Sequence, residues 1–137
     1  MDSLKLVWTE AENEPGQFFW DFVISGQSLY RRLRTHNVGI LGSVRPEYEG
    51  AIVDQLLMNR RGDYPSGCVA LYVCHLCSDI DCGAETAKIS RNNDLVTWSD
   101  FRFVSNRYED DASAIEGIGP FVFMYSQYSS AILERRK

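Results

Sequence analysis

The sequence predicts a single α+β domain over residues 1–137, built mainly from an antiparallel twisted sheet with two or three helices, including a C-terminal one. Several short segments alternate apolar and polar residues with period two, which is typical of half-buried strands, while other segments change to the helical period. A length of 137 residues with 45% hydrophobic residues suits one hydrophobic core. We therefore expect an N-terminal hairpin, a three-stranded meander and helices packed against them.

The N-terminal hairpin is predicted from two alternating segments, residues 4–9 and 18–25. Between them, Pro15 and Gly16 are typical of a type II turn, because proline fixes φ at the first central position and glycine accepts positive φ at the second. The two segments should therefore pair as antiparallel strands.

A change of period after the hairpin predicts helices. Ser28 is suited to cap a short helix whose outer face carries arginines, and residues 38–44 are interpreted as a short strand. Residues 46–59 form the clearest helical pattern, since Pro46 suits a first helical position. The side chains expected on the buried face of this helix are Tyr48, Ile52, Leu56 and Leu57.

The second half of the chain is interpreted as a meander followed by a helix. Its strands are predicted over residues 68–75, 84–90 and 95–104, and a polar segment, residues 106–115, is interpreted as a mobile loop. A short edge strand over residues 120–123 should lead into the C-terminal helix, with Tyr128 and Ile132 directed inward.

Charge and hydropathy limit the function classes. The formal net charge is −5 and 24% of the residues are charged, so the surface should repel nucleic-acid phosphates and attract a basic partner. No apolar stretch is long enough to cross a bilayer, and the first residues lack the pattern of a secretory signal. We therefore expect a cytoplasmic monomer with reduced thiols that binds neither nucleic acid nor membrane.

Three closely spaced cysteines, Cys74, Cys77 and Cys82, are the main chemical feature of the chain. A Cys-x-x-Cys pair can hold zinc, but a structural zinc site needs four ligands, and His75 or Cys68 would have to complete the set. A regular strand turns His75 away from Cys74 and leaves Cys68 about 20 Å distant. We expect no metal here, and thiols that are small buried groups in a tight connection between strands.

The remaining residues offer little for catalysis. The chain has two histidines, and neither is placed for a Cys-His pair. The acidic pair Asp79 and Asp81 lacks the apolar surroundings that would separate two pKa values, and no glycine-rich phosphate loop is present. We therefore expect no enzyme activity and no cofactor.

The aromatic residues are mostly interpreted as core, because sheet faces bury these residue types. Phe19 is out of phase with Trp20 and Phe22, so we expect it on the outer face as an interface anchor.

The motifs resemble a group of small bacterial proteins of uncharacterised function. They are Leu71-Tyr72-Val73-Cys74, Cys77, Cys82-Gly83-Ala84, the segment Asn93 to Phe101, and Gly119-Pro120-Phe121-Val122-Phe123 with Tyr128. The resemblance covers most of the chain and implies a shared fold. In that group the segment around the Cys-x-x-Cys pair often reads Cys-Pro-x-Cys-Gly. Here His75 and Ser78 stand in place of the proline and the glycine, which lowers the expectation of zinc.

By size, acidity and lack of catalytic groups, the chain also resembles the immunity proteins of toxin systems such as contact-dependent growth inhibition. This resemblance implies a protein that blocks a cognate, basic nuclease toxin stoichiometrically. The alternative is a zinc-binding or thiol-dependent protein that uses the three cysteines. The residues expected to contact the toxin are Asp79, Asp81, Glu109, Asp110, Asp111, Glu116 and Phe19.

Overall fold

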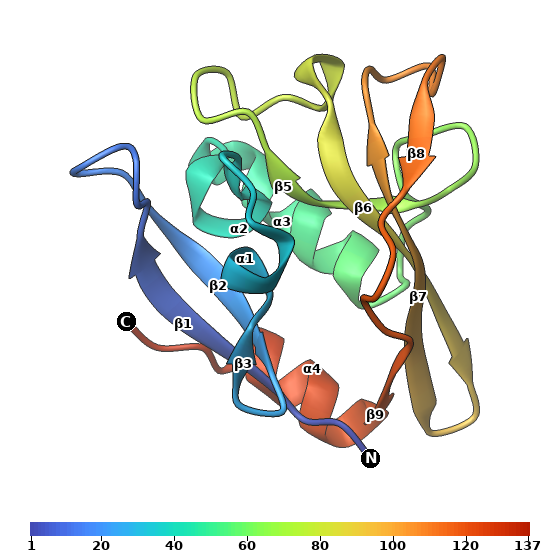
Figure 1. Ribbon diagram of the computed structural model, residues 1–137. Coiled ribbons are helices and arrows are strands. Elements are labelled where there is room, and N and C mark those ends of the chain that lie inside the picture. Colours follow the sequence, from blue (N-terminus) through green and yellow to red (C-terminus); the bar gives the residue numbers. More distant parts are fainter.

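A computed structural model describes residues 1–137 and confirms the α+β class, with two antiparallel sheets and a C-terminal helix. The first sheet has the order β1-β2-β3, and the second has the order β4-β5-β6-β7-β8, with β9 also pairing with β7. The two sheets face each other across the core, and α3 and α4 lie beside them (Figure 1). No helix is long and apolar enough to cross a membrane.

The predicted N-terminal hairpin is confirmed. Strand β1 (Leu4–Glu10) pairs with β2 (Phe18–Ile24), and β2 pairs in turn with the short β3 (Gln27–Ser28). At the predicted turn, Gly16 has a φ of 89°, and the Gln17 N–H donates to the Glu14 carbonyl at 3.1 Å. These are the features of a type II turn.

The helical segment after the hairpin differs in part from the prediction. Ser28 caps α1 (Leu29–Leu33) as expected, with its Oγ accepting the Arg31 N–H at 3.1 Å. The predicted strand over residues 38–44 is limited to β4 (Val38–Gly39), because a tight turn, α2 (Ile40–Ser43), follows directly, with a non-helical backbone at Leu41 and a φ of 96° at Gly42. The Ser43 hydroxyl donates to the Gly39 carbonyl at 2.6 Å and holds this turn closed.

Helix α3 (Pro46–Leu56) confirms the clearest helical prediction. The prediction that all four named side chains of this segment are buried is wrong for one of them. Ile52, Leu56 and Leu57 are buried, whereas Tyr48 is 55% exposed. Tyr48 lies in the first turn of the helix, where its side chain lines a surface cleft instead of the core.

The meander forms the second sheet. Strands β5 (Val69–Val73), β6 (Ala84–Asn92) and β7 (Leu95–Val104) pair in sequence order. Within the segment interpreted as a mobile loop, β8 (Ala112–Ala114) pairs with β7. That part of the loop interpretation is therefore wrong.

The C-terminal prediction is confirmed. Strand β9 (Phe121–Met124) pairs with β7 and runs into α4 (Tyr125–Leu133). Tyr128 and Ile132 are fully buried, and the Tyr128 hydroxyl donates to the Leu56 carbonyl at 2.6 Å. Trp98 donates its indole N–H to the same hydroxyl at 3.1 Å, so one buried tyrosine connects α4, β7 and the end of α3.

A buried carboxylate lies between the two sheets. Asp21 is 2% exposed and accepts hydrogen bonds from the Ser28 hydroxyl at 2.5 Å, the Tyr72 hydroxyl at 2.6 Å and the Tyr30 N–H at 3.2 Å. Burial raises the pKa of Asp21 above its ordinary value, although these hydrogen bonds favour the ionised form. The network joins β2, α1 and β5 through a single side chain.

Candidate functional site

The chemically distinctive residues meet at one end of the second sheet. The loop Cys74 to Gly83 connects β5 to β6, and the loop Ser105 to Asp111 connects β7 to β8. Both loops project from the same end of the sheet, at the top of Figure 1. The meander brings them together because each loop joins neighbouring antiparallel strands.

The three cysteines of the first loop form a cluster. The Sγ atoms of Cys74, Cys77 and Cys82 all lie within 4.8 Å of one another, and those of Cys77 and Cys82 are 3.0 Å apart. All three thiols are free. Cys74 is half-buried, but Cys77 and Cys82 are exposed, so the expectation of buried apolar thiols is wrong for these two. The chain leaves the strand here in an outward loop, and no core surrounds their sulfurs.

The backbone stabilises charge at the first cysteine of the cluster. Backbone hydrogen bonding by Cys77 and Leu76 to the charged form lowers the pKa of the Cys74 thiol below its ordinary value. The hydrogen bond with Cys77, together with the thiol charges nearby, raises the pKa of Cys82 to about 11. The pKa values of these two neighbouring thiols are therefore shifted in opposite directions.

His75 and Cys68, which the sequence suggests as further zinc ligands, lie outside this cluster. His75 Nδ1 is 3.3 Å from Glu14 Oε1, and the Cys68 sulfur is 3.7 Å from Glu109 Oε1. The cluster therefore offers three thiols from one loop. His75 and Cys68 each have a different partner.

A left-handed residue directly follows each of the two exposed cysteines. Ser78 has a φ of 52°, and Gly83 has a φ of 89°. A Cβ atom at Gly83 would lie 2.7 Å from the Val104 carbonyl oxygen, so this position requires glycine. Ser78 thus adopts the conformation that glycine adopts most easily.

This conformation allows a stability prediction. We expect Ser78→Gly to raise the free energy of unfolding by about 0.5–1 kcal/mol, because the replacement removes the cost of a left-handed residue that carries a Cβ atom. Urea unfolding measures the change. Ser78→Ala is the matched control, since it keeps the Cβ atom and should give no gain. A Ser78→Gly variant less stable than the wild type would contradict the prediction.

The acidic residues predicted for partner contact fall into two groups. Asp79 and Asp81 lie beside Arg107 of the second loop, which donates to both oxygens of the Asp81 carboxylate, at 2.7 Å for Oδ2. The Asp79 carboxylate lies 3.6 Å from the same guanidinium group. Glu109 anchors the second loop, because its Oε1 accepts the Ser66 N–H at 2.9 Å and the Ser66 hydroxyl at 2.7 Å. These three carboxylates therefore hold the loops in place.

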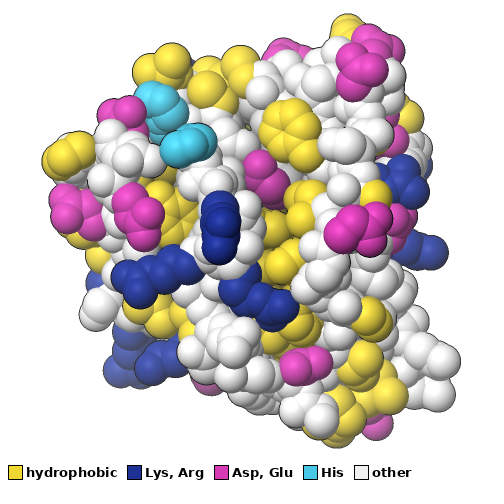
Figure 2. Space-filling view, viewed as in Figure 1, with side chains coloured by type: hydrophobic (Ala, Val, Ile, Leu, Met, Phe, Trp, Pro, Cys, Tyr) yellow, Lys and Arg dark blue, Asp and Glu magenta, His cyan; other side chains and the backbone are white.

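The other predicted contact residues are placed differently. Asp110 and Asp111 are exposed beside Glu109 and make no ion pair. Glu116 is exposed on the segment between β8 and β9, away from the two loops. Acidic side chains gather at the upper right of Figure 2, over the end of the sheet, and basic side chains gather near the centre of the same face.

The prediction for Phe19 is wrong. Its side chain is fully buried and packs edge-on against Tyr30, with ring centroids 4.9 Å apart, and against Tyr72. Helices α1 and α2 pack against β2. They cover the outer face of this strand, so Phe19 is buried although it points to the side opposite Trp20. Phe19 is therefore a core residue and is unavailable to a partner.

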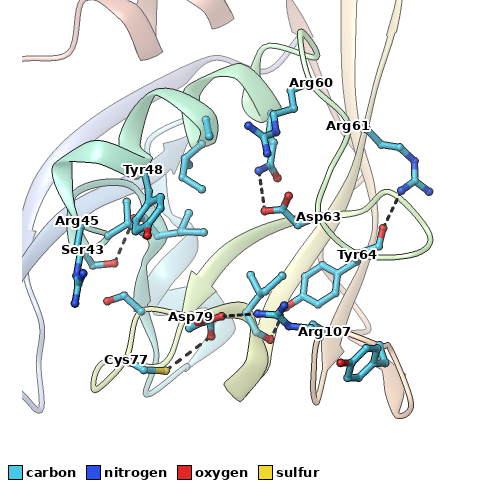
Figure 3. A pocket seen from close by; sticks show the side chains of 18 of the residues that line it. Ser43, Arg45, Tyr48, Arg60, Arg61, Asp63, Tyr64, Cys77, Asp79 and Arg107 are labelled. Atoms are coloured by element: carbon cyan, nitrogen blue, oxygen red, sulfur yellow. Dashed lines mark hydrogen bonds and ion pairs between the residues drawn. The ribbon is translucent and has the colours of Figure 1, made fainter.

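A cleft of about 1170 Å³ adjoins the two loops (Figure 3). Helix α3 and the segment Arg60 to Pro65 line one part of it, and residues Leu76 to Ile80 with Arg107 and Tyr108 line the other. Exposed apolar side chains surround it: Leu76 is 84% exposed, Tyr108 is 70% exposed and Tyr48 also belongs to the lining. Cys77 lines the cleft as well, which places the thiol cluster at its edge.

Sequence reasoning missed the cleft because it assigned its tyrosines to the core. A signal was available for Tyr108, since it lies within an acidic, polar segment that is a poor candidate for burial. Tyr48 fits the apolar period of α3, so the sequence pattern alone could not place it on the surface. Leu76 lies between Cys74 and Cys77 and belongs to no strand or helix pattern, so the sequence gives no sign of whether it is buried.

Comparisons with protein-family models, curated proteins and solved structures return no match to this chain. Functional inference therefore rests on the residues of the chain and their arrangement.

Proposed function

We propose that this chain is a protein-binding module of the immunity type, which neutralises a cognate basic toxin by covering it stoichiometrically. The observation that carries the proposal is the exposure of Tyr48, Leu76 and Tyr108 around one cleft. Large exposed apolar side chains grouped in this way are typical of interaction sites, and tyrosine is enriched among the residues that dominate binding energy.

The acidic loop beside the cleft supports a partner with a basic surface, while the cleft itself is lined by four arginines, Arg45, Arg60, Arg61 and Arg107, and two aspartates, Asp63 and Asp79. Asp110 and Asp111 are exposed on the loop that carries Tyr108, and the chain has a formal net charge of −5. Unpaired surface carboxylates increase the rate at which an oppositely charged protein finds its site. In this proposal the acidic loop attracts the toxin, and the tyrosines and Leu76 supply the contact that holds it.

Ordered loops also favour binding. The bonds from Arg107 to Asp81 and from Ser66 to Glu109 fix the two loops to each other and to the segment before β5. A surface that is ordered before binding loses less conformational entropy in the complex. The proposed mechanism requires no chemical step, no cofactor and no nucleic acid, and the proposed setting is the cytoplasm.

Calorimetry tests the proposal directly. The purified chain is titrated with the toxin domain encoded beside its gene, and we expect a one-to-one complex with a dissociation constant below about 1 μM. The affinity should fall as salt is added, because the acidic loop contributes to attraction. Binding weaker than this limit, or a neighbouring gene that encodes no toxin, would contradict the proposal.

A further inference from the structure

We propose that Cys74, Cys77 and Cys82 bind one zinc ion through their three sulfurs, with the fourth coordination position open to solvent. The inference goes beyond partner binding and does not depend on it. It also reverses our expectation from the sequence, which was based on the missing fourth ligand and on thiols buried in a tight connection.

The distances between the sulfurs suit one metal ion. Because Zn–S bonds are about 2.3 Å long, two sulfurs on one tetrahedral zinc ion lie about 3.8 Å apart. The sulfurs of Cys77 and Cys82 are 3.0 Å apart, and no pair in the cluster is separated by more than 4.8 Å. Shifts of less than about 1 Å would therefore bring all three into coordination, within the freedom of a side chain that rotates about one bond.

Packing does not explain why the three thiols gather. Free cysteines usually act as small apolar groups in a core, but Cys77 and Cys82 are exposed. A disulfide would use only two of the three sulfurs. The approach of three thiols, two of them exposed, is instead the arrangement that a thiophilic metal ion stabilises.

The backbone of the loop is already organised for coordination. The Ser78 N–H donates to the Cys74 carbonyl at 2.8 Å and closes the turn that brings Cys77 back beside Cys74. Left-handed residues at Ser78 and Gly83 then turn the chain away behind Cys77 and Cys82.

The fourth position is left open because the nearby side chains have other partners. The group of ligand atoms within 4.8 Å consists of the three sulfurs alone. Asp79 and Asp81 bind Arg107, and His75 lies beside Glu14. Three protein ligands with one open position leave room for a water molecule.

Metal analysis of the full chain tests the site without any partner. The untagged protein is purified without chelator in the presence of a non-thiol reductant, and we expect about one zinc per chain. After zinc is removed, added Co²⁺ should produce a thiolate-to-cobalt charge-transfer band and the visible bands of tetrahedral cobalt. Less than about half a zinc per chain, together with no charge-transfer band, would overturn the proposal. Iron in place of zinc would overturn the assignment of the metal.

Single substitutions assign the ligands. Cys77→Ser and Cys82→Ser should each weaken zinc binding by at least about 100-fold in a competition titration. Both side chains are exposed, so both variants should keep the circular dichroism spectrum of the wild type. Cys68→Ser is the matched control, because Cys68 lies outside the cluster, and it should retain the metal. If the two ligand variants keep wild-type affinity, or if Cys68→Ser loses the metal as they do, the assignment is wrong.

Discussion

Replacement of Asp21 by alanine is expected to lower the free energy of unfolding by about 3–5 kcal/mol. The carboxylate is the shared acceptor for the hydroxyls of Ser28 and Tyr72 and for the Tyr30 N–H. Tyr72 and Tyr30 are buried, so the substitution would leave their donors without an acceptor and without water. Urea unfolding followed by tryptophan fluorescence measures the loss, and a loss below about 1 kcal/mol would contradict the importance of this network.

Asp21→Asn is the matched control, because the amide keeps an acceptor oxygen and removes only the charge. Its loss of stability should be smaller than that of Asp21→Ala. The difference in free energy of unfolding between the wild type and Asp21→Asn should also depend on pH. Since burial raises the pKa of Asp21 in the native state, the native chain holds this proton more tightly than the unfolded chain does.

The sign of the pH effect follows from this difference. The stability that Asp21 contributes is greatest below its ordinary pKa of 3.8 and falls as the pH rises through the raised native value. Asp21→Asn cannot titrate at this position. The free energy of unfolding of the wild type, minus that of Asp21→Asn, should therefore decrease as the pH rises above the ordinary pKa of 3.8. An increase with rising pH would show that the native pKa is lowered instead.

The second large effect concerns the cleft. We expect the double variant Tyr48→Ala/Tyr108→Ala to bind the toxin domain at least about 100-fold more weakly than the wild type, since each truncation removes a large contact ring. Both side chains are more than half exposed, so the stability of the free chain should change little. Calorimetry gives the affinity, and urea unfolding checks the fold.

Leu133→Ala is the control for this experiment. Leu133 is 61% exposed on α4 and does not line the cleft. Its truncation should leave the affinity unchanged. If the double tyrosine variant binds as the wild type does, the cleft is not the contact surface, and an equal loss in Leu133→Ala would place the contact elsewhere on the molecule.

Much of the fold could be predicted because local patterns follow directly from the geometry of strands and helices. Period-two alternation located β1, β2 and β7, and Ser28 marked the start of α1. The type II turn at Gly16 required only the residues Pro15 and Gly16. These features depend on neighbours in the sequence, and the structure confirms them.

The candidate site was predictable only in part. The sequence identified the three cysteines and the acidic segments, but their interpretation depended on assumptions about burial. A regular strand through Cys74 would have separated the potential ligands, whereas the chain turns directly after Val73. Arg107 was not considered, because its partners Asp79 and Asp81 lie more than twenty residues away in the sequence.

The sequence by itself determined the α+β class, the hairpin and meander, the acidic charge and the presence of three neighbouring cysteines. Only the tertiary structure decided that Phe19 is buried, that Tyr48 and Tyr108 are exposed around one cleft, and that three sulfurs approach one point. The physical reason is that periodicity reports which residues share a face of one element. Which face is covered, and which loops meet, depends on contacts between segments that are distant in the chain.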